Sequence, residues 1–111
     1  MQHGCIFCKI IDGQIPCQKI HESSDLIVIK DIAPRAPIHY LVIPKKHIKN
    51  LQSAENEDKN LIYSMLLVTK ELAKGLAEPQ DFRVVSNNGS SVGQSVLHLH
   101  FHFLAGKQLC E

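Results

Sequence analysis

The stretch Leu97-His98-Leu99-His100-Phe101-His102-Phe103-Leu104 decides the fold, because histidine alternates with large apolar residues along it. A β-strand turns successive side chains to opposite faces, so the three histidines are expected on one face and the apolar residues on the other. Alternate residues of a strand lie roughly 6.5–7 Å apart, which allows three imidazoles to contact one small ligand. We therefore predict a strand over residues 96–105 with a functional site on its histidine face.

Working outward from this strand, the sequence predicts four further strands. They are expected over residues 19–22, 26–30, 39–43 and 82–86, with the first two forming a hairpin. Two prolines in residues 33–37 favour an extended loop before the third strand. A polar, glycine-containing loop is expected over residues 87–95, directly before the histidine strand.

Two helices complete the expected fold. A short helical turn over residues 5–11 is ended by Asp12-Gly13. A long helix, capped by Ser53 and reaching about Ala77, is predicted from apolar residues spaced by four, three, four and four. These apolar residues are Leu61, Met65, Val68, Leu72 and Leu76. The order of elements predicts an α+β fold with a five-stranded, mainly antiparallel sheet.

The composition favours one domain over residues 1–111. The 111 residues are 44% hydrophobic and carry a formal net charge of +1, with lysine and arginine spread along the chain. A nucleic-acid partner is not expected, since such partners require a concentrated basic surface. No apolar run approaches the roughly 20 residues of a membrane span, and no signal peptide is recognised. We expect a cytoplasmic protein without a membrane partner.

The residues alone leave three interpretations of the histidine strand open. It is a half-exposed strand with polar residues outward, a metal-binding strand, or a catalytic site, since imidazole is both a common metal ligand and a nucleophile. The polar loop before it admits either a plain Asn88-Gly89 turn or phosphate binding through glycine backbone and the donors of Gln94 and Ser95.

The segment of residues 93–104 resembles the signature of the histidine triad superfamily, His-φ-His-φ-His-φ-φ with φ apolar. Residues 6–11, 31–39 and 41–48 look like matching blocks of its Hint branch, the purine nucleoside phosphoramidases. The resemblance implies hydrolysis of purine nucleoside phosphoramidates or aminoacyl adenylates to the nucleoside monophosphate. It also implies a homodimer whose two sheets join.

The resemblance further implies residue roles. His100 would be the nucleophile and form a nucleotidyl-histidine intermediate, while His102, His39 and Ser95 would contact the phosphate or help to protonate the leaving group. Asp31 would bind the ribose. The remaining residues would hold phosphate and ribose (Asn87, Gly93 and Gln94) or form the base pocket (Phe7, Ile10 and Ile32). The chemistry agrees, because a neutral imidazole retains a nucleophilic lone pair near pH 7.

Cys5 and Cys8 have the Cys-x-x-Cys spacing of structural zinc sites, which need two more ligands. A redox pair and two buried thiols are the alternatives, and the redox pair lacks a βαβ context. The resemblance implies structural zinc held by these cysteines with His47 and His98, and no organic cofactor.

Two departures from the family pattern leave the leaving group open. Ala105-Gly106 stands where relatives often have Gly-Gly, and the chain ends soon afterwards. Hydrolysis of dinucleoside polyphosphates is therefore an alternative, although Ser95 favours the phosphoramidase because a hydroxyl can relay a proton to a departing amine. The second alternative is a nucleotide-binding scaffold or sensor with little catalysis.

Overall fold

One five-stranded antiparallel sheet forms the centre of the molecule. The computed structural model describes residues 4–107, so the C-terminal tail discussed above lies largely outside the described residues. The strands are β1 (Lys19–Glu22), β2 (Leu26–Lys30), β3 (Ile38–Pro44), β4 (Phe82–Val85) and β5 (Phe101–Ala105). They pair in the order β1-β2-β3-β5-β4, and every pairing is antiparallel. The predicted α+β fold is confirmed.

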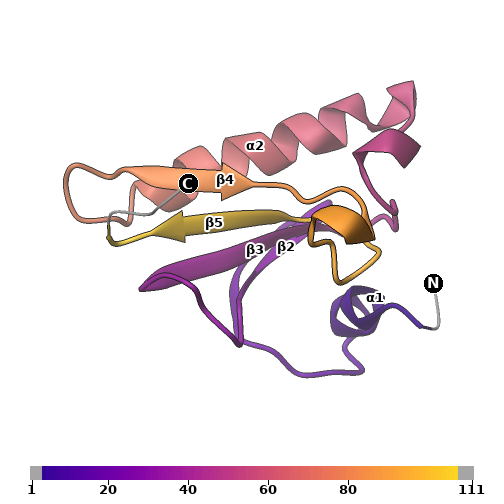
Figure 1. Cartoon of the computed structure of the whole chain (residues 1–111), viewed down its shortest axis with the longest axis horizontal. Helices are drawn as coiled ribbons and strands as arrows, with labels where there is room; N and C mark the ends of the chain where they lie inside the picture. The colour runs from indigo at the N-terminus through magenta and orange to yellow at the C-terminus, as the bar shows by residue number, and fades with distance from the viewer. Residues whose placement is uncertain (1–3, 108–111) are drawn as a thin grey trace.

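The two helices lie on opposite faces of this sheet (Figure 1). The long helix α2 (Lys59–Ala73) covers one face, and the short helix α1 (Ile6–Ile11) lies against the other near the ends of β2 and β3. Each face has its own core. Met65 and Val68 of α2 pack with Val28, Val42 and their neighbours. On the other face, residues of α1 pack with side chains of β2 and β3 that include Ile27, Ile29, Leu41 and Ile43.

The start and end of α2 differ from the sequence prediction. Ser53 does not cap it, because Asn50 caps a separate 3-10 helix (Leu51–Ser53) and accepts the Ser53 backbone N–H at 3.1 Å. A second 3-10 turn (Asn56–Asp58) is closed by reciprocal hydrogen bonds between Glu55 and Asp58, and α2 begins only after it. At the other end α2 stops at Ala73, directly before Lys74 and the helix-disfavouring Gly75, so Leu76 lies beyond it. None of the helices in residues 4–107 is long and apolar enough to cross a membrane.

The last strand is shorter than predicted. It was expected to begin at Val96, yet β5 begins at Phe101, opposite Val42 of β3. Pairing with β4 begins at His102, opposite Val85. The segment before Phe101 thus has no neighbouring strand on either side, and the Leu99 N–H donates instead to the carbonyl oxygen of Ile48 at 2.6 Å. His98 and His100 lie in this segment outside the sheet, which bends over residues 96–98.

The predicted alternation of faces is maintained from His98 onward but fails at Leu97, which is 48% exposed instead of packing in the core, because the chain bends over residues 96–98. Leu99 and Phe101 pack in the core beneath α2. The ring of Phe7 from α1 contacts the rings of His98 and His100 with centroid distances of 5.8 and 5.0 Å. The three histidines are therefore on the α1 side, but they are buried, which excludes the interpretation of a half-exposed strand with polar residues turned to solvent.

The packing of α2 predicts the cost of removing its central side chain. Met65 is fully buried on the side of α2 that packs against the sheet, so Met65→Ala should lower the free energy of unfolding by about 2–5 kcal/mol. Chemical denaturation followed by circular dichroism measures this loss. Lys59→Ala, an exposed change in the same helix, is the control. A loss below about 0.5 kcal/mol for Met65→Ala, the range of surface substitutions, would contradict this packing.

Candidate active site

The first element of the site is the orientation of His100. Its Nδ1 lies 2.7 Å from the carbonyl oxygen of His98. A carbonyl oxygen can only accept, so Nδ1 carries the proton and Nε2 carries the lone pair. The ring is 6% exposed and packs edge to face on Phe7. The backbone thus presents one nucleophilic nitrogen in a mostly apolar setting.

His39 and His102 form a hydrogen-bonded pair beside it. The backbone N–H of Arg35 donates to His39 Nδ1 at 3.1 Å, which places the proton of a neutral His39 on Nε2. That Nε2 lies 2.9 Å from Nδ1 of His102 and donates to it. The proton of a neutral His102 is consequently on its own Nε2. One backbone amide therefore determines the tautomers of two successive rings.

Burial keeps these rings uncharged at neutral pH. The pKa of His102 is lowered to about 4, chiefly because burial removes water from the charged form and secondly because His100 and His39 are close. Burial also lowers the pKa of His100 and of His39 below the ordinary histidine value. A neutral His100 is the nucleophilic form of the ring.

Asp31 lies at the outer end of the histidine pair. One carboxylate oxygen accepts the Ala33 N–H at 2.8 Å, and the other lies 3.3 Å from His39 Nε2. Asp31, His39 and His102 each place one possible ligand atom within 4.8 Å of the others. The lone pair of His102 Nδ1 already accepts a hydrogen bond from His39, so it is not available to a metal ion. Hydrogen bonding alone explains why these three side chains lie together.

A second cluster joins α1 to the residues that follow β3. His98 Nδ1 lies 3.3 Å from Cys5 Sγ, 3.6 Å from Cys8 Sγ and 3.1 Å from His47 Nδ1. His47 Nδ1 lies 3.3 Å from Cys8 Sγ. The other nitrogen of His98 donates to the carbonyl oxygen of Pro44 at 2.8 Å, so the lone pair of Nδ1 points into the cluster.

The donor set of this second cluster fits a tetrahedral zinc ion. Zinc prefers thiolate and imidazole, and its usual bond lengths give ligand separations of about 3.3–3.8 Å. The distances of 3.1–3.6 Å between the nitrogen and sulfur atoms of this cluster are close to these values. The bond from His98 to Pro44 also matches the outer hydrogen bond that metal-binding histidines usually make. All four residues that the sequence predicts as ligands are brought together.

Gln94 holds the loop before the triad. Its Oε1 accepts the Gly89 N–H at 2.8 Å, and its Nε2 donates to the carbonyl oxygens of Lys49 and Val96 at 2.7 and 3.1 Å. The side chain is buried, and Gly93 adopts a positive φ of 100°. In this arrangement the Gln94 amide is committed to the backbone, and its contact with a phosphate remains a prediction.

The other predicted nucleotide-binding residues fall into two groups. Phe7 and Ile10 are buried on the α1 face, whereas Ile32 is 99% exposed at the edge of the loop before β3. Asn87 is half-buried, and Ser95 is exposed. Among the described residues, Ser95 makes no hydrogen bond to a triad histidine. It lines a hollow of about 530 Å³ together with Cys5 and His47.

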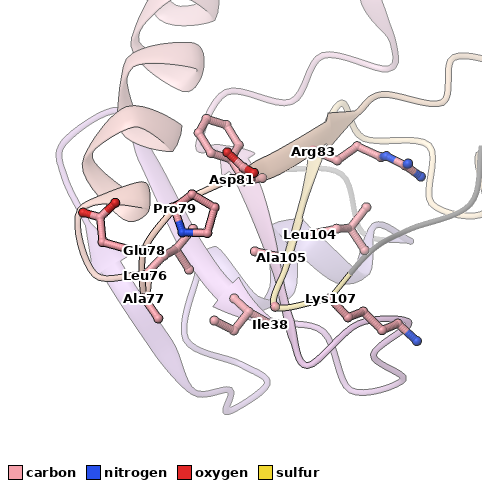
Figure 2. Close-up of a pocket in the computed structure, with 12 residues that line it drawn as sticks. Ile38, Leu76, Ala77, Glu78, Pro79, Asp81, Arg83, Leu104, Ala105 and Lys107 are labelled. Atoms are coloured by element: carbon pink, nitrogen blue, oxygen red, sulfur yellow. The ribbon is translucent and has the colours of Figure 1, made fainter.

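A larger hollow lies at the far end of β5, away from His100. Its volume is about 630 Å³, and it is lined by the start of β4, the end of β5 and the chain after α2. Figure 2 shows Arg83 and Lys107 extending to one side of it and Glu78 to the other. Neither His100 nor His102 lines it, so volume alone does not identify the reactive site.

The sequence did not indicate Arg35 as a site residue. Its backbone N–H orients His39, and its guanidinium nitrogen lies 3.4 Å from His102 Nδ1. The available signal was its position four residues before His39 in a loop constrained by proline.

Comparison with known proteins gives consistent matches over nearly the whole chain. A family model described as "Scavenger mRNA decapping enzyme C-term binding" matches residues 4–110. An uncharacterized HIT-like protein of Synechocystis sp. is 44% identical over 107 residues, which cover 96% of this chain and 94% of that protein. One of Chlamydia muridarum is 45% identical over 101 residues, covering 91% and 80% respectively.

Solved structures match equally well. A HIT family hydrolase from Legionella pneumophila Philadelphia 1 superposes with a TM-score of 0.90 at 40% identity, over 96% of each chain. A histidine triad protein from Clostridium difficile gives a TM-score of 0.93 at 40% identity, over 100% of this chain and 97% of that one.

The contacts of Gln94 predict what its loss does to the loop. Gln94→Ala should lower the free energy of unfolding by about 1–3 kcal/mol, because three backbone groups lose their partner. Amide exchange at Gly89 should accelerate. Gln94→Glu should be at least as damaging, since a carboxylate would face two carbonyl oxygens. Unchanged stability and unchanged exchange in both variants would contradict this role.

Proposed function

This chain belongs to the histidine triad family, and on that premise we propose that it is a nucleotide hydrolase that cleaves purine nucleoside phosphoramidates or aminoacyl adenylates. The observation that carries the proposal is the bond from His100 Nδ1 to the His98 carbonyl oxygen, which leaves Nε2 as a nucleophile. We infer a covalent nucleotidyl-histidine intermediate on His100.

In the proposed first step, His100 Nε2 attacks the α-phosphorus of the nucleotide. The new bond is N–P, and the bond that breaks joins phosphorus to the amine nitrogen or the acyl oxygen. The Nε2–H of neutral His102 can donate a hydrogen bond to the phosphoryl oxygens or to the leaving atom, with His39 holding the ring. The proton that the leaving group takes up is proposed to come from water through the Ser95 hydroxyl. Water then attacks phosphorus, releases the nucleoside monophosphate and restores neutral His100.

Nucleotide binding is proposed around this centre. Ile32 is an exposed apolar side chain next to Asp31, which suits one wall of a base pocket with Phe7 and Ile10 behind it. Asp31 offers carboxylate oxygens to the ribose hydroxyls. The loop that carries Asn87, Gly93 and Gln94 supplies backbone and side-chain donors for phosphate.

Replacing His100 tests the proposed nucleophile. His100→Ala should reduce kcat for adenosine 5′-phosphoramidate about a thousandfold or more, because the attacking atom is removed, while AMP binding and folding persist. Continuous assay of AMP release measures the loss, and His21→Ala, at an exposed histidine of β1, should retain full activity.

Near-normal turnover by His100→Ala would contradict the assignment. Faster cleavage of diadenosine polyphosphates than of phosphoramidates by the wild type would favour the dinucleoside polyphosphate hydrolase. Tight AMP binding without turnover of either substrate class would favour the scaffold or sensor.

We also propose that Cys5, Cys8, His47 and His98 hold zinc. Zinc bound there would cross-link α1 to the segment that carries His98, two residues before the proposed nucleophile. Untagged protein should contain about one equivalent of zinc. Cys8→Ser should lose it and lower the Tm, whereas Cys17→Ser, outside the cluster, should keep it. Less than a tenth of an equivalent in wild-type protein would refute the site.

A homodimer is proposed through β4 and α2. The outer edge of β4 has no strand partner in the described part of the chain, and α2 exposes Tyr63, Leu66 and Leu67. Leu66→Glu with Leu67→Glu should convert the dimer to a monomer, because two charges would enter an apolar contact. Analytical ultracentrifugation measures this. Leu51→Glu, at an exposed leucine elsewhere, should not change the mass, and a monomeric wild type would contradict the proposal.

A cytoplasmic location also remains a prediction.

A further inference from the structure

Arg35 is held beside the active site by its own loop. The loop between β2 and β3 is fixed at both ends, since the Asp31 N–H donates to the His39 carbonyl oxygen at 3.0 Å and the Arg35 N–H donates to His39 Nδ1 at 3.1 Å. Pro34 and Pro37 restrict the backbone on either side of Arg35. The position of Arg35 is therefore coupled directly to a histidine of the site.

The guanidinium of Arg35 has an incomplete set of partners. Its nitrogen lies 3.4 Å from His102 Nδ1, but that atom has one lone pair and already accepts from His39 at 2.9 Å. Within residues 4–107, Arg35 forms no ion pair with a carboxylate, although a guanidinium carries five N–H donors. Arg35 is thus an exposed cation that faces a buried neutral imidazole pair.

The register of the strands puts Arg35 at the His102 end of the row of histidines. His39 pairs with Leu104, two residues beyond His102 along β5. His39 and the Arg35 that contacts it therefore lie on the side of His102 that is farther from His100. In a displacement at phosphorus, the attacking and leaving atoms are roughly in line. A leaving group that departs along the row of histidines, away from His100, would therefore reach Arg35.

We propose that Arg35 is a specificity-determining residue that binds an anionic group, carboxylate or phosphate, carried by the leaving group of the substrate. This inference rests on the proposed hydrolase function and deepens it. A guanidinium pairs with either anion through two parallel hydrogen bonds, which lysine cannot reproduce. Arg35 then selects amino acid conjugates with a free carboxylate, or polyphosphates, over conjugates with neutral amines.

Three substrates that share AMP test the proposal. They are adenosine 5′-phosphoramidates of glycine and of glycinamide, which differ in one carboxylate, and diadenosine triphosphate, whose leaving group is a nucleoside diphosphate. Arg35→Ala should lower kcat/KM about 10- to 100-fold for an anionic leaving group and less than about threefold for glycinamide. Arg35→Lys should show an intermediate loss.

Lys59→Ala is the matched control, because it removes one positive charge from an exposed residue of α2 on the opposite face of the sheet. It should leave all three values unchanged. A loss confined to the glycine conjugate identifies carboxylate as the anion, and one confined to diadenosine triphosphate identifies phosphate. An equal loss on all three substrates, or no loss on any, would overturn the proposal.

Failure of the proposed hydrolase function can be distinguished from failure of the proposed role of Arg35. If wild-type protein turns over none of the three compounds, the hydrolase proposal fails, and affinities measured by calorimetry decide the role of Arg35. Arg35→Ala must then weaken binding of an anionic compound more than binding of the glycinamide conjugate. Equal affinities in both proteins would refute the role.

Discussion

The site depends on one hydrogen bond, between His100 Nδ1 and the carbonyl oxygen of His98. A buried imidazole can be protonated on either nitrogen, and only one tautomer directs a lone pair into the site. The acceptor is a main-chain carbonyl oxygen, so its position depends on how His98 is held. The ring of His98 is itself anchored to Pro44 at the end of β3 and to the Cys5, Cys8 and His47 cluster.

Backbone groups also fix the tautomers of the other two histidines of the site. The backbone amide of Arg35 orients His39, and His39 orients His102, so three site histidines take their tautomers from two backbone groups. Burial of several imidazoles is costly unless they are neutral and hydrogen-bonded. The residues 4–107 contain no buried side-chain nitrogen or oxygen without a partner. The fold therefore holds the rings ready to react without the expense of buried charge.

Much of this arrangement was predictable from sequence, because it follows from local rules. Alternation along the histidine segment predicted one histidine face, and the two prolines of residues 33–37 predicted the loop before β3. The start of β5 was not predictable, because it depends on where pairing with the two neighbouring strands ends, at Val42 of β3 and Val85 of β4. The start of α2 was decided by reciprocal bonds between Glu55 and Asp58 rather than by the Ser53 signal. Arg35 was missed because its contact with His102 spans 67 positions in the sequence.

The most direct test of this account is the protonation of the histidine rings in solution, observed by long-range ¹H–¹⁵N NMR correlations near pH 7. We expect a neutral His100 with its proton on Nδ1, and neutral His39 and His102 with their protons on Nε2. A neutral His100 protonated on Nε2, or a His100 that is charged at this pH, would contradict it, since neither form directs a lone pair from Nε2 at a phosphorus atom.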